Sequence, residues 1–307
     1  MVNKTVLGFL SAKRYEVQAL ILVRSLRQFG GELADIPVWI YVPEGREMQG
    51  PALDALYELK VEVIPFALDE ALWKFPFASK AVASALAEAR AEAEGVQLAW
   101  HDRTGMVGNT PKDFILPSGK AIGFRPTDIA NIGAPYGEPL PPFWQKVLTH
   151  FGLSADQLPP ITTAIDQKTL HLYVNAGLLV VRPENQTLRT WAANLEETYL
   201  LPEFKPFYQE NQAYAVFMHQ AALTAAVVQT TQPGERLILP DSYLFSVDNF
   251  FDYPEALQPA KLDDIVTGRF HDFFALENWR DLVIASEDLM QWFEAQLSYG
   301  PYWLEAE

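Results

Sequence analysis

Runs of apolar and β-branched residues alternate along this chain with segments whose apolar positions recur at helical spacing. In the first part of the chain, residues 17–29 have helical spacing and stop at two glycines, and residues 79–94 form an alanine-rich segment of high helix propensity. Strand patterns occur in TVLGFLSA (5–12), PVWIYVP (37–43), VEVIPF (61–66) and the apolar stretch GVQLAWH (95–101). This alternation predicts an α/β fold, in which a mostly parallel central sheet is flanked by helices.

The second part of the chain repeats the alternation with longer interruptions. Helical patterns cover residues 141–152, 186–199 and 209–220, and the apolar AALTAAVVQ (221–229) either extends the last helix or forms a separate buried element. Strand or mixed aromatic patterns occur in KAIGFRP (120–126), HLYVNAGLLVVRP (171–183), RLILP (236–240), SYLFSVDNFFDYP (242–254) and VTGRFHDFF (266–274). A C-terminal helix completes the pattern.

The composition favours one large globular domain over residues 1–307. The chain is 49% hydrophobic and 20% charged, and no linker, internal repeat or low-complexity tract divides it. We expect no transmembrane segment, because no apolar run approaches the roughly 20 residues that cross a bilayer. The N-terminal VLGFL runs into charged residues without a signal-peptide cleavage pattern, and the absence of cysteine fits a reducing compartment, so we expect a cytoplasmic protein.

Charge and cysteine content narrow the possible partners. A formal net charge of −16 without clusters of lysine and arginine argues against a nucleic-acid partner. Because there is no cysteine, a metal would need oxygen or imidazole ligands. An anionic substrate stays compatible with the acidic chain if a local basic pocket or a metal offsets the overall field. The sequence also leaves open whether the chain forms a homo-oligomer.

Polar residues directly after the strands are the first candidates for a site, because ligands of open parallel sheets bind outside the carboxyl ends of the strands. Ser11 and Tyr15 follow the first strand, where a nicotinamide or flavin enzyme would place a glycine-rich loop that this chain does not have. Tyr15 offers a face for stacking a base, and Lys13 or Arg14 could meet a phosphate. The same residues are equally typical of a solvated turn.

The order of several motifs indicates a family. They are LSAKRYEVQALILVRSL, FPFASKAVASALAEA with Lys80, LAWHDRTGMV, YVNAGLLVVRP, ENQAYAVF, LPDSYLFS and the histidine of GRFHDFF. In this order, over roughly residues 5–275, the chain resembles nucleotide-diphospho-sugar transferases of the A-type (GT-A) fold, and within them the retaining group that includes glycogenin and the lipopolysaccharide galactosyltransferases. The resemblance implies a glycosyltransferase that moves a hexose from a nucleoside diphosphate sugar to a glycan or small-molecule acceptor, with retention.

The resemblance also implies how the chain is divided. Residues 1–109 would form a nucleotide-binding half, residues 110–275 a half that binds the donor sugar and the acceptor, and residues 276–307 a C-terminal helix and tail.

The metal site of the resembling families is degenerate in this sequence. In those families two carboxylates on alternate residues, joined by a late histidine, hold a divalent cation that bridges the diphosphate. Asp102 stands at the first carboxylate position, Thr104 replaces the second, and His271 matches the histidine. These residues could still bind Mn²⁺ or Mg²⁺ weakly, or the positive charge could come directly from Lys80, Arg103 or Arg125. A purely structural reading also remains, in which Asp102 caps a turn and His101 packs at the strand end.

The donor site and the reacting groups follow from the same resemblance. Donor-binding candidates are Ser11, Tyr15, Lys80, Asp102, Arg103, Asn175, Ala176 and Gly177, of which the last three lie in the Asn-Ala-Gly motif that touches the donor sugar. Gln212 matches the residue beneath the anomeric carbon in retaining enzymes, and Asp166 stands where the family grips donor-sugar hydroxyls. If the enzyme is inverting, Asp166 or Glu210 would be the base that deprotonates the acceptor. Tyr243 and Phe245 are candidates for acceptor stacking.

Two functions therefore remain open at this stage. One is an active hexosyltransferase with a degenerate metal site. The other is an inactive protein of the same fold that binds a nucleotide sugar or a glycan without turning it over.

Overall fold

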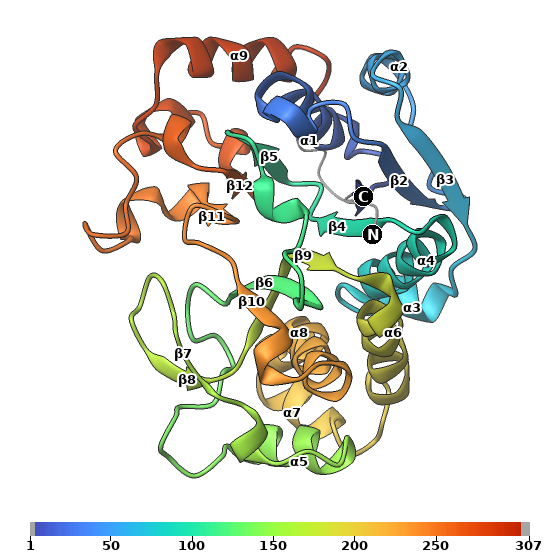
Figure 1. The fold of residues 1–307 in the computed structure, drawn as a ribbon, viewed down its shortest axis with the longest axis vertical. Coiled ribbons are helices and arrows are strands. Elements are labelled where there is room, and N and C mark those ends of the chain that lie inside the picture. Colours follow the sequence, from blue (N-terminus) through green and yellow to red (C-terminus); the bar gives the residue numbers. More distant parts are fainter. Residues whose placement is uncertain (1–3, 302–307) are drawn as a thin grey trace.

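A seven-stranded sheet forms the centre of the molecule, and helices cover both of its faces (Figure 1). The computed structural model describes residues 4–301. The strands lie in the order β10-β6-β9-β4-β1-β2-β3, with the bounds β1 Thr5–Leu10, β2 Val38–Pro43, β3 Glu62–Phe66, β4 Gln97–His101, β6 Ile122–Pro126, β9 Val174–Val181 and β10 Arg236–Ile238. Every strand runs in the same direction except β9, which is antiparallel to both of its neighbours. The predicted α/β class with a mostly parallel sheet is confirmed.

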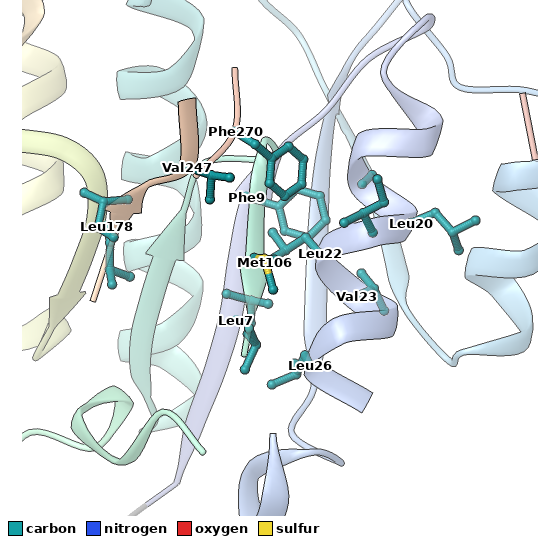
Figure 2. Close-up of a cluster of buried hydrophobic side chains, with 14 of the residues drawn as sticks. Leu7, Phe9, Leu20, Leu22, Val23, Leu26, Met106, Leu178, Val247 and Phe270 are labelled. Atoms are coloured by element: carbon teal, nitrogen blue, oxygen red, sulfur yellow. The ribbon is translucent and has the colours of Figure 1, made fainter. Parts of the chain in front are cut away.

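One face of the sheet packs against α1 (Glu16–Phe29). Because side chains alternate along a strand, Leu7 and Phe9 of β1 both point to this face. Figure 2 shows them beside leucines of α1 and beside Met106 of the short strand β5 (Gly105–Val107). All of these residues are buried. The helix and the strand that precedes it therefore share one apolar layer.

The other face packs against α4 (Ala78–Glu94), α6 (Thr187–Thr198) and α8 (Gln212–Thr230). The sheet presents large rings here, including Trp39 and Trp100, whereas the buried face of α4 is made mostly of alanine. Small helix side chains opposite large strand side chains fill the layer at the density of a close-packed interior.

The remaining elements surround the sheet. A small sheet of β5, β11 (Phe245–Ser246) and β12 (Thr267–Arg269) lies on the α1 side, and β7 (Pro160–Thr162) pairs with β8 (Thr169–His171) in a separate hairpin. The other helices are α2 Pro51–Glu58, α3 Glu70–Lys74, α5 Pro142–His150, α7 Lys205–Glu210 and α9 Glu287–Leu297. None of the helices within residues 4–301 has the length and apolar character needed to cross a bilayer.

Two details differ from the sequence patterns. The apolar stretch after residue 220 extends the preceding helix, so α8 reaches Thr230, while residues before Gln212 form the separate helix α7. The strand predicted over residues 171–183 is two strands, because the chain leaves the hairpin at His171 and enters the main sheet at Val174. The last part of the predicted C-terminal tail, residues 302–307, lies outside the described residues.

The topology fixes where a site can form. The strand order reverses between β1 and β4, since β2 and β3 continue on one side of β1 and β4 pairs on the other. The reversed direction of β9 brings its first residues to the same edge as the carboxyl ends of β1, β4 and β6. Polar residues that follow three strands and begin a fourth therefore meet at one edge.

Candidate functional site

A cavity of about 320 Å³ opens at this edge, where the strand order reverses. It is lined by Leu10, Ser11, Ala12, Tyr15, Trp73, Phe77, Ser79, Lys80, His101, Asp102, Arg103, Thr104, His271 and Asp272. Its walls are thus the ends of β1 and β4, the first turn of α4, and the segment after β12. Most donor-binding and metal-binding residues predicted from the sequence line this one cavity.

Lys80 and Asp102 form an ion pair in the cavity wall. The α4 helix precedes β4 and runs back along the sheet, so its first turn, with Lys80, lies at the edge where β4 ends. The Lys80 side chain is 7% exposed and that of Asp102 is 24% exposed. Burial lowers the pKa of Lys80, and Asp102 opposes this shift. Burial alone would raise the pKa of Asp102, but Lys80, with smaller contributions from His271 and His101, holds that pKa below its ordinary value.

Arg103 covers one face of Tyr15, the ring that the sequence offered for stacking a base. The guanidinium carbon of Arg103 lies 3.7 Å from the ring centroid, and its Nε donates to Gln18 Oε1 at 3.1 Å. The two predicted donor-binding residues therefore form one cation–π pair on the cavity wall.

Two buried polar atoms beside the cavity have no hydrogen-bond partner within the described residues: Ser11 Oγ and His101 Nε2. Ser11 is fully buried and His101 is 1% exposed. Burial lowers the pKa of His101 to about 4, so the ring is neutral at pH 7, and its Nδ1 donates to the Asp102 carbonyl oxygen at 2.9 Å. The Nε2 lone pair is thus an acceptor without a donor. Buried polar groups are almost always satisfied, and these two atoms lie without a protein partner on residues that line the cavity.

The Asn-Ala-Gly motif lies at the start of β9, next to the end of β4. Gly177 accepts a hydrogen bond from the Asp102 backbone N–H at 2.8 Å, and Asn175 Oδ1 accepts from the Gly177 N–H at 2.9 Å. The Ala176 N–H donates to Gln220 Oε1 of α8 at 3.1 Å. A side chain on Gly177 would meet the Leu244 methyl groups at 2.8 and 2.9 Å, so the small residue here also permits a close packing contact.

A second buried charge cluster, which the sequence analysis did not identify, lies at the same edge. Asp128 follows β6, is 5% exposed, and accepts from Arg269 Nη2 of β12 at 2.7 Å. The same oxygen, Oδ2, lies 3.5 Å from Asn175 Nδ2, and the other oxygen, Oδ1, lies 3.4 Å from the Tyr253 hydroxyl. Arg269 Nη1 donates to His271 Nε2 at 2.6 Å. Asp128 could have been predicted from its position just after a strand, whereas no feature of the sequence points to its partner Arg269.

The three predicted metal ligands, as they lie, do not fit a divalent cation. Asp102 pairs with Lys80, the lone pair of His271 Nε2 accepts from Arg269, and Thr104 contributes a hydroxyl in place of a carboxylate. Desolvation and the Arg269 cation lower the pKa of His271. In the described part of the chain, no group of three His, Cys, Asp or Glu side chains is placed to hold a metal. Each of the two strongest predicted ligands thus contacts a protein cation: Asp102 contacts Lys80, and His271 contacts Arg269.

The three candidate catalytic residues do not line the cavity. Asp166 lies in the turn between β7 and β8, where its carboxylate accepts from the Thr163 hydroxyl at 2.5 Å and from the Ala130 N–H at 3.1 Å. These hydrogen bonds outweigh the effect of burial and lower the pKa of Asp166. Glu210 ends α7 and Gln212 begins α8, and both are exposed.

Aromatic residues are distributed differently from expectation. Trp73 and Phe77 line the cavity, and Phe77 is 47% exposed. Tyr243 and Phe245 are 3% and 2% exposed. The idea that these two stack on an acceptor is wrong, because the Tyr243 hydroxyl accepts from the Asp113 N–H and Phe245 stacks on Tyr253 inside the core.

Comparison with known proteins now identifies the family. The family model described as a Rhodobacterales glycosyltransferase domain matches residues 7–230, which is most of the chain and includes the ends of β1, β4 and β6 and the start of β9. The chain belongs to this glycosyltransferase family. No curated protein matches its sequence.

Solved structures confirm that this glycosyltransferase has the GT-A fold. The galactosyltransferase LgtC, in complex with donor and acceptor sugar analogues, is 11% identical, with a TM-score of 0.50 over 94% of this chain and 99% of LgtC. The bifunctional glycosyltransferase WbbM is 10% identical, with a TM-score of 0.52 over 97% of this chain, and this chain spans about half the length of WbbM, 50%.

Proposed function

We propose that this glycosyltransferase transfers a hexose from a nucleoside diphosphate sugar, bound in the cavity between β1 and β4, to a hydroxyl group of a glycan or small-molecule acceptor. The observation that carries the proposal is the cavity itself. It joins the Arg103–Tyr15 pair, the buried Lys80, and two residues with unpartnered buried polar atoms, Ser11 and His101, at the point where the strand order reverses.

The base and the diphosphate of such a donor can each be matched to side chains that line the cavity. A base can stack on the remaining surface of Tyr15 or on Trp73, and the diphosphate can meet Lys80 and Arg103. These groups come from residues 1–109, which supports a nucleotide-binding role for the first part of the chain. Asn175, Asp128 and the 110–275 region would then face the sugar and the acceptor.

We propose that transfer occurs with retention. In that case the acceptor attacks the face that the diphosphate leaves, and the leaving phosphate takes the acceptor proton, so no strong protein base is required. Gln212 as the residue beneath the anomeric carbon, and Asp166 as a grip on sugar hydroxyls, stay predictions. So do the cytoplasmic location and self-association.

The alternative, a protein that binds a nucleotide sugar without turnover, is not favoured. Family membership supports an enzyme, and the cavity at the strand ends is lined by aromatic rings and a buried lysine that suit a nucleotide donor.

The test is calorimetric binding of UDP, GDP and their common hexosides to the full chain in the presence of Mn²⁺, followed by nuclear magnetic resonance of the sugar released or transferred. We expect one nucleotide to bind, and Tyr15→Ala to weaken it by about tenfold, the loss of one base-stacking contact. Tyr57 of α2, which is 55% exposed and does not line the cavity, is replaced in the matched control Tyr57→Ala. If none of these nucleotides binds, the proposal is wrong. If one binds without any turnover, the inactive alternative is favoured.

A further inference from the structure

We infer that Lys80 acts as the resident cation for the donor diphosphate, so that this glycosyltransferase binds and uses its donor without a divalent metal. The inference rests on the proposed function, because it concerns how the same cavity holds a nucleoside diphosphate.

Glycosyl transfer needs a positive charge at a defined place. The bond between the anomeric carbon and the β-phosphate oxygen breaks, and its electron pair stays on that oxygen. A bond from the acceptor oxygen to the anomeric carbon forms, and the acceptor proton moves to the leaving phosphate. Negative charge therefore develops on the diphosphate before the proton arrives, and a fixed cation there stabilises the transition state.

The side chains that would hold a metal are each held by a protein cation. Lys80 pairs with Asp102, and Arg269 donates to His271 Nε2 at 2.6 Å. At the second carboxylate position Thr104 is 9% exposed and carries no charge. A divalent cation would have to displace an ammonium from Asp102 and a guanidinium from His271, and would gain only one carboxylate in return.

Lys80 itself is placed to take over the role of the metal. It lies in the first turn of the 17-residue helix α4, whose positive dipole end adds to the ammonium charge. Its side chain is 7% exposed, and a charge in so dry a place interacts more strongly with a phosphate than a surface lysine does. Asp102 keeps the ammonium in position, and the Asp102 backbone is itself fixed to Gly177.

The other basic candidates have different positions. Arg125 does not line the cavity: its Nη1 donates to the Leu239 carbonyl at 2.7 Å and its Nη2 pairs with Asp241. Arg103 lies over the Tyr15 ring and can contribute a second contact to the diphosphate. The carboxylates that line the cavity are Asp102, paired with Lys80, and Asp272, which is exposed at the rim. Lys80 is therefore the buried cation that both lines the cavity and pairs with Asp102, the first predicted metal ligand.

The experiment measures the affinity of the full chain for UDP, GDP and their hexosides by calorimetry, once in EDTA and once in Mn²⁺. We expect the dissociation constant of the bound nucleotide to agree within about twofold between the two conditions. In Lys80→Gln the diphosphate should bind about 10- to 100-fold more weakly, the effect of removing a charged hydrogen-bond donor, and Mn²⁺ should not restore it. The matching nucleoside, which has no phosphate, should bind wild type and variant equally.

The controls separate the possible failures. Lys74→Gln removes a lysine whose side chain is 72% exposed and should change nothing. If wild type binds a nucleotide only with Mn²⁺, or if Lys80→Gln keeps the affinity for the diphosphate, the inference is wrong while the proposed function stands. If no nucleotide binds in either condition, the proposed function fails as well. Should Lys80→Gln not fold, the comparison of EDTA with Mn²⁺ on wild type decides alone.

Discussion

Arg269 donates from Nη2 to the Asp128 carboxylate at 2.7 Å, and this bond joins β12 to the loop after β6 across 141 positions of sequence. Asp128 is 5% exposed and the Arg269 side chain 17% exposed. Burial alone would lower the pKa of Arg269, but Asp128 outweighs that effect and raises it. The pair thus connects the small sheet to the main sheet beside the candidate site.

The first prediction concerns this buried pair. Asp128→Asn should lower the free energy of unfolding by roughly 3–5 kcal/mol, because it leaves the guanidinium without its counter-charge. In Asp128→Asn combined with Arg269→Met, the loss should be clearly smaller than the sum of the two single losses. Urea unfolding of the three variants measures these values.

An exposed ion pair provides the control. Arg280 and Glu294 have side chains that are 39% and 51% exposed, so Glu294→Gln should cost less than about 1 kcal/mol. If Asp128→Asn costs no more than this control, or if the double substitution is additive, Arg269 and Asp128 do not stabilise one another.

The sequence predicted the sheet better than its connections. Apolar runs of six to eight residues mark strands that are buried on both faces, and β1, β2 and β9 are buried along their whole length. The hairpin β7–β8 and the three-residue strand β5 gave no such signal, because strands that short have too few residues to show a period.

The candidate site follows the same division. Ser11, Asp102 and Asn175 lie at one edge, and this could be predicted because a strand end is a local feature that the sequence shows. The partners of these residues do not follow from the sequence. The Arg269 contact to His271, which removes a metal ligand, depends on where β12 pairs in the small sheet, and β12 is only three residues long. The burial of Tyr243 and Phe245 likewise depends on packing with distant segments.

The second prediction concerns stability in acid. Burial lowers the pKa of His219 to about 3 and of His101 to about 4, so both stay neutral in the folded protein while the unfolded chain takes up protons near pH 6.5. Their contribution to stability is complete above pH 6.5 and is lost as the pH falls towards these lowered values. Between pH 7.5 and 4.5, wild type should therefore lose roughly 2–3 kcal/mol more of its free energy of unfolding than His219→Gln does.

Urea unfolding at the two pH values tests this expectation. An unchanged slope in His219→Gln would show that this histidine is protonated equally in the folded and unfolded chains.

The third prediction gives the alkaline limit of donor binding. Burial lowers the pKa of Lys80, so its ammonium loses its proton at a lower pH than a surface lysine. Nucleotide affinity should therefore fall on the alkaline side below the ordinary lysine pKa, and Lys80→Arg should move this fall to higher pH because a guanidinium keeps its proton. Calorimetric titration at increasing pH, in EDTA, measures the pH at which nucleotide affinity falls. If Lys80→Arg binds the nucleotide but its affinity falls at the same pH as that of wild type, another group controls this fall.

The fourth prediction concerns Gly177, where a new methyl group would lie 2.8 Å from one Leu244 methyl group and 2.9 Å from the other. Leu244 is 1% exposed and has little room to move, so Gly177→Ala should cost roughly 1–3 kcal/mol through overpacking. It should also weaken nucleotide binding, because the Gly177 carbonyl holds the Asp102 backbone. Leu244→Ala in the same chain should relieve the crowding and recover part of the affinity, although it leaves a cavity of its own. Gly234→Ala is the control, since a methyl group there meets no atom within 4 Å. Equal stability of the two glycine variants in urea would show that Leu244 yields to the methyl group and that Gly177 is not required for packing.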